Sequence, residues 1–327
     1  MPYTEKDALM AARMVFPEAK SAHPLKKGYS HEVFEVKVKN KEVIVRFSNG
    51  NKGNHSLEKQ IIVNKMLHEK GLPVPEVILY EKKGNRSKNE FVIMSKLQGH
   101  DVSELWSKMD EEEKCKVAEL VGELLGKIHK IKLKEFGGIT PEGIDNKHGR
   151  FKMKKVGIEY PIHYHVADYL ARAFNDVGLL AAHDFIKPDF IVKIIKYITE
   201  RKHLASTDEK PTLVHGDFEP RNIMIRKENN NWKISGLFDF EFSESRIREY
   251  DFLKLRRYGY FDDPKIKRAL LKGYSKYQKI GKDFDKKVEF FQFIRDIGFA
   301  VFLLKAGNKE LAMKTLHRVK KDIHTSQ

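Results

Sequence analysis

The sequence contains one cysteine, Cys115, among its 327 residues. A single thiol cannot form an intramolecular disulfide or a cysteine-based metal cluster, and both absences favour a reducing, cytoplasmic compartment. The chain also lacks the run of about 18 apolar residues that a membrane-spanning helix needs. The most apolar segment, residues 291–304, includes Arg295 and Asp296, so we expect a buried helix and no membrane contact. Residues 1–20 carry scattered charges without an apolar centre, which argues against a secretory signal.

A concentrated basic block is also missing, although 62 Lys and Arg against 46 Asp and Glu give a formal charge of +16. The lysines are spread over the whole length and alternate with acidic residues. A nucleic-acid binder would need a basic stripe with interleaved aromatic side chains. We therefore expect a solvated, lysine-rich surface and no nucleic-acid partner. No heptad repeat indicates an oligomeric state, which stays open.

The apolar fraction of 41% is sufficient for packed cores, and a length of 327 residues indicates about two domains or one two-lobed unit. Residues 5–15 predict a short helix. Alternating apolar residues in 26–50 predict a β-hairpin that turns at 40–41. A helix over 56–70 begins at Ser56 and ends at Gly71, and residues 72–97 predict two more strands around a turn at 84–85.

After Gly99 the apolar spacing becomes helical. The predicted helices cover residues 109–131, 163–180, 184–202, 264–281 and 284–306. A short strand pair at 223–226 and 232–239 interrupts them. The sequence thus predicts an α+β, bilobal fold with a small antiparallel-sheet N-lobe, residues 1–96, and a larger, mostly helical C-lobe, residues 97–327.

The segment LVHGDFEPRN, residues 213–222, has the spacing H-x-D-x-x-x-x-N. Asp217 is placed to orient an acceptor hydroxyl and to accept its proton, while Asn222 supplies an oxygen ligand for magnesium on nucleotide phosphates. His215 would support the loop through hydrogen bonds. Asp239, in GLFDFE at the end of an apolar strand, adds a second hard oxygen ligand. Each residue alone fits a turn or a cap, but the combination favours phosphoryl transfer.

HGDFEPRNIMI followed by GLFDFE resembles the aminoglycoside phosphotransferase and choline kinase group, which has the protein-kinase-like fold. Gly216 replaces the arginine of the protein-kinase motif H-R-D, and Glu241 replaces the glycine of D-F-G, so a protein kinase is not expected. The resemblance implies an ATP- and Mg²⁺-dependent O-phosphotransferase, with GTP not excluded. The alternative is a catalytically weak, nucleotide-binding regulatory protein on the same fold.

The resemblance also implies a nucleotide site in the N-lobe. GYSHEVFEV at 28–36 is similar to the phosphate loop, in which Gly28 permits close backbone approach and Ser30 offers donors. VIVRF at 43–47 matches the strand that holds the phosphates. Alternation along this strand places Ile44 and Arg46 on one face, so Ile44 would pack on adenine and Arg46 would reach the phosphates.

The partner of Arg46 is ambiguous from sequence. Alignment on LPVP places Gln60 where the family usually has a glutamate, and Glu58 lies on another face of the same helix. FVIMSKLQG at 91–99 resembles the hinge, where the backbone around Ser95 and Leu97 would bind adenine. Asp251 in EYDF resembles a residue that holds the catalytic loop rather than one that reacts.

The acceptor is the least readable part of the sequence. Aminoglycosides are polycations that need an acidic pocket, and a net charge of +16 does not attract them. Acidic candidates are Glu219, Glu241, Glu244, Glu249, Asp262 and Asp263. We interpret them as ordinary surface charges paired with Lys and Arg. Residues 140–200 would form the acceptor insert, with Tyr164, Tyr169 and Phe174 in its core. Aminoglycoside-like antibiotics, other amines, sugar alcohols and macrolides all stay open as acceptors. The sequence also leaves open whether the protein serves drug resistance or metabolism.

Overall fold

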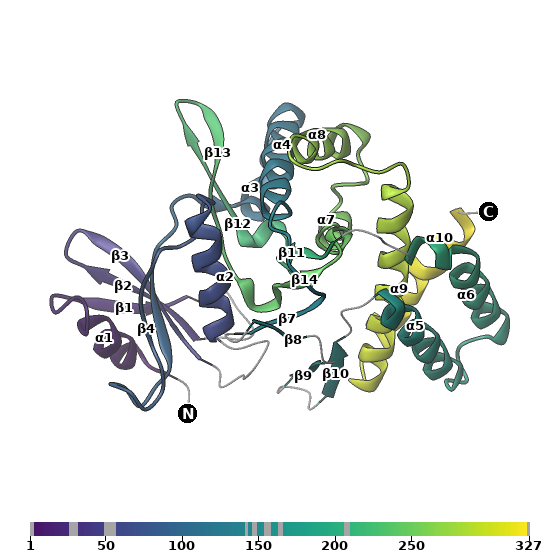
Figure 1. The fold of residues 1–327 in the computed structure, drawn as a ribbon, viewed down its shortest axis with the longest axis horizontal. Helices are drawn as coiled ribbons and strands as arrows, with labels where there is room; N and C mark the ends of the chain where they lie inside the picture. Colours follow the sequence, from purple (N-terminus) through teal and green to yellow (C-terminus); the bar gives the residue numbers. More distant parts are fainter. Residues whose placement is uncertain are drawn as a thin grey trace.

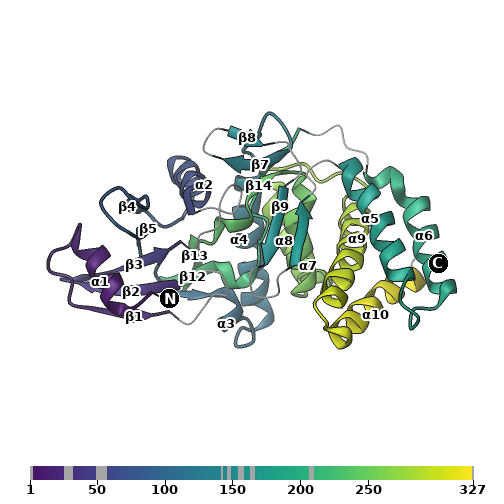
Figure 2. The same ribbon diagram turned by 90° about the horizontal axis from the view of Figure 1, so that it is seen from below.

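The computed structural model describes residues 3–25, 32–48, 57–140, 143–145, 149–153, 158–162, 166–205 and 210–325. The fold is bilobal and α+β, as predicted (Figure 1). The N-terminal sheet lies at one end of the molecule, and a helical group lies at the other end (Figures 1 and 2). That group consists of α5 (Val166–Ala181), α6 (Pro188–Arg201), α9 (Phe284–Lys305) and α10 (Lys309–Thr325). No helix of the described ranges is long and apolar enough to span a membrane.

The N-lobe contains a five-stranded antiparallel sheet in the order β1-β2-β3-β5-β4. Its strands are β1 (Ser21–Pro24), β2 (Glu32–Val38), β3 (Lys41–Phe47), β4 (Val77–Glu81) and β5 (Phe91–Ser95). In β3, Val43, Val45 and Phe47 are buried against α1 (Glu5–Arg13), whereas Ile44 and Arg46 lie half-buried on the other face. The predicted alternation therefore directs Ile44 and Arg46 toward the C-lobe.

Helix α2 (Leu57–Glu69) crosses the space between the lobes, and Gly71 ends it with a φ of 71°. Lys59 on α2 is fully buried and donates hydrogen bonds to the carbonyls of Glu241 and Ser243 in the C-lobe. These bonds fix α2 to the short η4 helix (Phe240–Phe242) that follows Asp239. The predicted cap Ser56 lies outside the described residues.

The chain passes from one lobe to the other at residues 96–99, where the backbone packs closely on the C-lobe. β6 (His100–Asp101) pairs with β12 (Ile223–Glu228), which pairs with β13 (Asn231–Leu237). Gly99 has a φ of 100°, and a Cβ atom there would overlap the carbonyl of Ile225. Ser235 Oγ donates to Gln98 O at 2.5 Å. The connection is therefore held on two sides, while the division at residues 96 and 97 stays a prediction.

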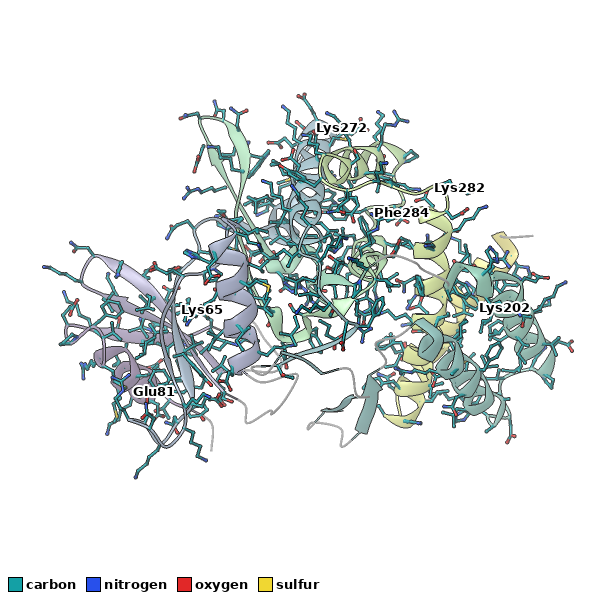
Figure 3. All side chains as sticks on the ribbon, in the orientation of Figure 1. Lys65, Glu81, Lys202, Lys272, Lys282 and Phe284 are labelled. Atoms are coloured by element: carbon teal, nitrogen blue, oxygen red, sulfur yellow. The ribbon has the colours of Figure 1, made fainter. Side chains whose placement is uncertain are left out.

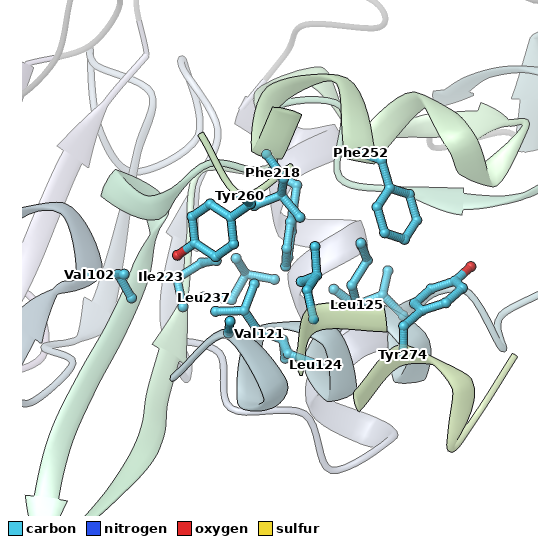
Figure 4. Packing of buried hydrophobic residues seen from close by; sticks show 14 of the residues in the cluster. Val102, Val121, Leu124, Leu125, Phe218, Ile223, Leu237, Phe252, Tyr260 and Tyr274 are labelled. Atoms are coloured by element: carbon cyan, nitrogen blue, oxygen red, sulfur yellow. The ribbon is translucent and has the colours of Figure 1, made fainter. Parts of the chain in front are cut away.

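The C-lobe core forms around α4 (Glu111–Ile128) and α8 (Pro264–Ser275), which meet at Gly122 and Gly273. Figure 4 shows Phe218, Phe252, Tyr260 and Tyr274 packed in this core with aliphatic side chains of α4. Phe218 follows Asp217 directly and has no exposed surface. The core thus anchors the loop that carries the predicted catalytic residue.

The five predicted C-lobe helices are present, but the sequence did not predict α3 (Val102–Trp106), α7 (Phe252–Arg257) or α10. It also missed the short strands β7 (Gly137–Thr140), β8 (Gly143–Asp145), β9 (Gly149–Met153), β10 (Ile158–Ile162), β11 (Thr212–Val214) and β14 (Glu244–Arg246). Strands of three to five residues contain too few positions for a period of two to stand out. Phe174 is 42% exposed, so its assignment to a core was wrong.

Charged side chains cover both lobes, as Figure 3 shows for Lys65 in the N-lobe and for Lys202, Lys272 and Lys282 in the C-lobe. Many of the lysines lie within ion-pair distance of carboxylates, for example Lys272 Nζ at 2.8 Å from Glu119. The lysine-rich surface predicted from the composition is therefore spread out rather than gathered into one stripe.

Candidate active site

The loop that follows β11 is held by one buried carboxylate. Asp251 accepts hydrogen bonds from the backbone amides of His215 (2.8 Å) and Gly216 (2.7 Å), and its side chain is fully buried. His129 Nε2 lies 3.1 Å from the same carboxylate. Gly216 has a φ of 78°, and an added Cβ would overlap Phe242 O. The predicted structural role of Asp251 is confirmed, and glycine is required at position 216.

His215 connects this loop to the end of β13. Its Nε2 lies 3.0 Å from the carbonyl oxygen of Phe238, and its Nδ1 lies 3.3 Å from the amide nitrogen of Asp217. A carbonyl can only accept and an amide can only donate, so these contacts assign the neutral tautomer with the proton on Nε2. His215 is thus placed to orient the backbone around Asp217, which matches the predicted support of the loop.

Asp217 and Asn222 lie together in the structure. Asn222 Nδ2 donates to the backbone carbonyl of Asp217 at 2.9 Å and to its Oδ2 at 3.3 Å. This orientation of the amide leaves Asn222 Oδ1 free of the contact with Asp217, so an oxygen remains to bind a cation. Phe238 N donates to Asn222 O at 3.1 Å, which brings the neighbouring Asp239 to the same place.

Asp239 adopts the left-handed conformation, with φ 71° and ψ 63°. Asp tolerates this region better than most residues, but it still costs free energy that the surrounding structure must offset. Its Oδ1 lies 3.1 Å from Arg46 Nη2, across the boundary between the lobes. Arg46 Nε is buried without a hydrogen-bond partner in the described part of the chain. An anionic ligand beside Arg46 would satisfy this donor.

The two helical candidates for the partner of Arg46 have different surroundings. Glu58 forms an ion pair with Lys82 at 2.6 Å, so its carboxylate is engaged in the N-lobe. Gln60 is buried and lines the same cavity as Arg46. The acidic partner of Arg46 is Asp239, which the sequence analysis had not proposed for this contact.

A cavity of about 400 Å³ lies between the lobes. Its lining includes Ile44, Arg46, Gln60, Ser95, Leu97 and Asp239. Six of the predicted residues are therefore collected around one space of the size that small-molecule sites usually have. The amide of Ser95 donates to Glu76 O at 2.9 Å, so a ligand at this edge would use the Ser95 carbonyl or Leu97 instead. Gly28 and Ser30 lie outside the described residues.

Lys254 is a site residue that the sequence analysis missed. Its Nζ on α7 lies 2.6 Å from Asp217 Oδ1 and 3.2 Å from Glu219 Oε2. Glu219 is buried and also contacts Arg221 (2.5 Å) and the hydroxyl of Tyr258 (3.0 Å). Burial alone would raise the pKa of Glu219, but Lys254 and Arg221 outweigh it and hold that pKa below its ordinary value. Only the tertiary fold brings α7 to this loop.

The acidic candidates for amine binding are mostly internal. Glu219, Glu241, Glu244 and Glu249 are at most 4% exposed, so their description as surface charges was wrong. Pairing with basic residues is confirmed for Glu244, which contacts Arg246, and for Glu249, which lies 3.8 Å from Arg248. Asp263 caps α8 by accepting from two of its backbone amides.

A magnesium site on these residues is chemically reasonable. The described residues contain no group of three or more His, Cys, Asp or Glu side chains that could hold a metal alone. Mg²⁺ bound to nucleotide phosphates needs only one or two protein oxygens, because phosphates and waters complete its coordination. Asn222 Oδ1 and the Asp239 carboxylate supply such oxygens, so the donor set fits.

Several solved structures have the same fold. The GDP complex of aminoglycoside 2'-phosphotransferase-IIIa superimposes with a TM-score of 0.67 at 15% identity, over 99% of this chain and 100% of that chain. An apo thermostable mutant of APH(4)-Ia gives 0.63 at 13% identity, over 97% and 99%. The streptomycin–ATP complex of APH(2")-IIa gives 0.60 at 17% identity, over 98% and 97%.

Sequence comparisons identify the family to which the chain belongs. No curated protein matches the chain. A model of the phosphotransferase enzyme family (APH) matches residues 21–284, which include the inter-lobe cavity, the Asp217 loop and α7. The chain therefore belongs to the phosphotransferase enzyme family.

Proposed function

We propose that this member of the phosphotransferase enzyme family transfers the γ-phosphate of ATP to a hydroxyl group of a small molecule, with Mg²⁺ as cofactor. One observation carries the proposal. The Asp217–Asn222 contact and the Arg46–Asp239 pair are joined through the Phe238–Asn222 hydrogen bond, so an acceptor-side carboxylate adjoins a nucleotide-side cavity. This is the arrangement that positioning a hydroxyl against a terminal phosphate requires.

The nucleotide would occupy the inter-lobe cavity. Ile44 would pack on the base, and the Ser95 carbonyl with the Leu97 backbone would bind its edge. Arg46 would contact the phosphates, where its unpartnered Nε would gain an acceptor, and Gln60 would support it. Gly28 and Ser30 are proposed to cover the phosphates. Nucleotides bound to the similar structures include GDP and ATP, so GTP stays an alternative donor.

Asn222 and Asp239 would hold the metal. Mg²⁺ would neutralise charge on the transferred phosphate group. Asp217 would orient the acceptor hydroxyl and accept its proton as the oxygen bonds to the γ-phosphorus and the bond to the β-phosphate oxygen breaks, which releases the nucleoside diphosphate. His215 would fix the backbone of Asp217. Most of the rate gain in this chemistry comes from placement and charge neutralisation.

The proposal names the acceptor only as a small molecule with a hydroxyl group. Similar structures contain kanamycin, hygromycin B or streptomycin, so aminoglycosides enter the test alongside other amines and sugar alcohols. The competing proposal is a catalytically weak, nucleotide-binding regulatory protein. The ion pair between Lys254 and Asp217 favours it, because an engaged carboxylate is less available as a base. The cytoplasm as the compartment rests on the single cysteine.

The test is nucleotide consumption with Mg²⁺ for the wild type and Asp217→Asn, across aminoglycosides, amines, sugars and their acids. We expect one acceptor class to stimulate turnover and the substitution to reduce it by roughly 10²- to 10⁴-fold. Binding of the non-hydrolysable analogue AMP-PNP should be retained in Asp217→Asn. Nucleotide binding without stimulation by any acceptor would favour the regulatory alternative. Equal turnover by wild type and Asp217→Asn would refute the role of Asp217.

A further inference from the structure

The acceptor must approach Asp217 from the side of α7. The lining of the inter-lobe cavity includes Asp239 and the hinge residues Ser95 and Leu97, but neither Asp217 nor any residue of α7. With the nucleotide in that cavity, the carboxylate of Asp217 is reached from the opposite side, where Lys254 lies 2.6 Å away. The inference below rests on the proposed function and concerns the chemistry of that side.

Carboxylates near this side are already engaged. Glu219 is shared by Lys254, Arg221 and the Tyr258 hydroxyl. On α9 and α10, three acidic residues lie beside arginines. Glu289 (3.1 Å) and Asp322 (3.9 Å) contact Arg256, and Asp296 (3.4 Å) contacts Arg318. Each of these groups would have to give up a basic partner in order to bind an amine of the acceptor, and for the buried Glu219 and Asp296 that exchange is costly.

Two arginines on the same side have no such carboxylate. The guanidinium of Arg257, one turn of α7 beyond Lys254, lies over the ring of Phe299 at 5.1 Å. The guanidinium of Arg295 on α9 lies over the ring of Tyr250 at 5.7 Å. Among the described side chains, no carboxylate forms an ion pair with either of them. Ring faces attract cations but cannot accept the directed hydrogen bonds of a guanidinium.

The surroundings of Arg257 favour an added negative charge. Partial burial lowers the pKa of Arg257, Asp296 opposes that change, and the like charges of Arg318 and Arg295 lower the pKa further. An anion beside Arg257 and Arg295 would relieve this repulsion, whereas a second cation would increase it. Planar guanidinium groups bind phosphate and carboxylate oxygens through paired hydrogen bonds.

We propose that the acceptor is a hydroxy compound carrying a phosphate or carboxylate group, which Arg257 and Arg295 bind while its hydroxyl reaches Asp217. Lys254 stays on Glu219 and Asp217 and contributes a third positive charge beside the carboxylate of Asp217. The formal charge of +16 favours the approach of such an acceptor and opposes a polycation. The acceptor class thus differs from the aminoglycosides in the similar structures.

The first experiment compares acceptors that share one carbon skeleton and differ in charge: glycerol, glycerate, glycerol 3-phosphate and 3-amino-1,2-propanediol, then glucose, gluconate, glucose 6-phosphate and glucosamine. We expect kcat/KM to be at least ~10-fold higher for an anionic member than for its neutral or cationic counterpart, since one charged contact is worth about that factor. Comparing phosphate with carboxylate identifies which anion is bound. Preference for the amine would overturn the inference and leave the proposed function standing.

Variants assign any preference to the arginines. The double substitution Arg257→Ala and Arg295→Ala should raise KM for the anionic acceptor by ~10-fold or more and leave the neutral acceptor within about 2-fold. Arg268→Ala, an exposed arginine on α8 with the same charge change, should leave both unchanged. An equal loss for neutral and anionic acceptors in the double variant would refute the assignment to charge.

A binding measurement decides the question without turnover. Inorganic phosphate is titrated by calorimetry into protein loaded with AMP-PNP and Mg²⁺, so that the nucleotide phosphates already fill their own site. We expect wild type and Arg268→Ala to bind phosphate and the double variant to bind it at least ~10-fold more weakly. Equal binding by the double variant, or no binding by wild type, overturns the inference. Failure of AMP-PNP to bind would instead refute the proposed function, and the phosphate comparison would then be read on nucleotide-free protein.

Discussion

At the scale of single residues, Asp239 combines a strained backbone with a half-buried ionic contact. Its left-handed conformation at φ 71° turns the chain sharply between β13 and η4, and its carboxylate meets Arg46 from the other lobe. Asn229 and Asn230 adopt positive φ in a surface turn, where such residues are usual. A strained residue that also carries an inter-lobe contact is more consistent with a functional constraint.

The substitution Asp239→Asn separates the backbone requirement from the charge. Asparagine tolerates the left-handed region and can still accept a hydrogen bond from Arg46, so we expect a change in unfolding free energy of less than about 1 kcal/mol. Loss of the anionic metal ligand should reduce turnover by roughly 10²-fold or more. Thermal denaturation and nucleotide consumption measure the two effects. The matched control is Glu310→Gln, which removes the same charge from an exposed ion pair with Lys314 on α10. Full activity of Asp239→Asn would exclude Asp239 from the metal site.

At the scale of elements, α4 and α8 approach each other through two glycines. A Cβ atom at Gly122 would overlap Leu270 O, and one at Gly273 would overlap Glu119 O. Both neighbours are backbone atoms of a helix, so they cannot move aside as a side chain would. The two helices carry Val121, Leu124 and Tyr274 into the core that supports Phe218, which links their spacing to the Asp217 loop (Figure 4).

Alanine at either crossing glycine is therefore expected to destabilise the protein. We expect Gly122→Ala and Gly273→Ala to lower the unfolding free energy by about 1–3 kcal/mol or more, because overlap must force the helices apart. Gly178→Ala on α5 is the control, since nothing lies within 4 Å of its added Cβ. Removing a helical glycine there should raise stability by roughly 0.5–1 kcal/mol. Denaturant unfolding measures all three, and equal effects would refute the close crossing.

The attachment of α2 to η4 depends on the amino group of Lys59, which is fully buried. Burial lowers the pKa of Lys59 to about 8, although Glu244, Glu241 and Asp239 act to raise it. The unfolded chain has the ordinary lysine pKa of about 10.4 and therefore binds more protons than the folded protein between these two values. Stability must then rise with pH across this window, because the unfolded state gives up the proton that the fold has already lost.

Comparison of wild type with Lys59→Met tests this sign. From pH 8 to about 10.5, the unfolding free energy of the wild type should gain on the order of 3 kcal/mol relative to the variant. Below pH 8 the difference should be constant. Tyrosines that titrate at high pH affect both proteins equally, so the difference between their curves isolates Lys59. Parallel curves throughout would show that Lys59 has the same pKa in the folded and unfolded states, which would contradict a pKa lowered by burial.

At the scale of the whole molecule, the sequence predicted local features better than contacts between residues that lie far apart in the chain. The alternation in residues 43–47 correctly placed Ile44 and Arg46 on one face, and the residues of the H-x-D-x-x-x-x-N motif, Asp217 and Asn222, lie in contact in the structure. Both depend on geometry within a few residues. The Arg46–Asp239 pair spans 193 positions, and Lys254 reaches Asp217 only through the packing of α7, so neither has a local signal. The same holds for the burial of Glu219 and Glu241.

The two lobes share the cavity, so a ligand that fills it should stabilise them together. Residues of β3 and α2 line one side, and Phe238, Asp239 and Met224 line the other. A nucleotide therefore gains contacts that exist only when both lobes are folded and closed on each other. Binding to the folded state alone raises the unfolding free energy by about 2.7 kcal/mol at a ligand concentration of 100 times Kd.

We accordingly expect AMP-PNP with Mg²⁺ to raise the Tm of the wild type by roughly 4 °C at that concentration, in a single transition. Chelation of Mg²⁺ should remove most of the shift, because the phosphates would then face Asp239 without a cation between them. Asp217→Asn should keep the full shift, since Asp217 lies outside the cavity lining. Asp239→Asn should lose the part that depends on Mg²⁺. A shift that is independent of Mg²⁺ in every variant would place the nucleotide away from Asn222 and Asp239, and would contradict the metal site.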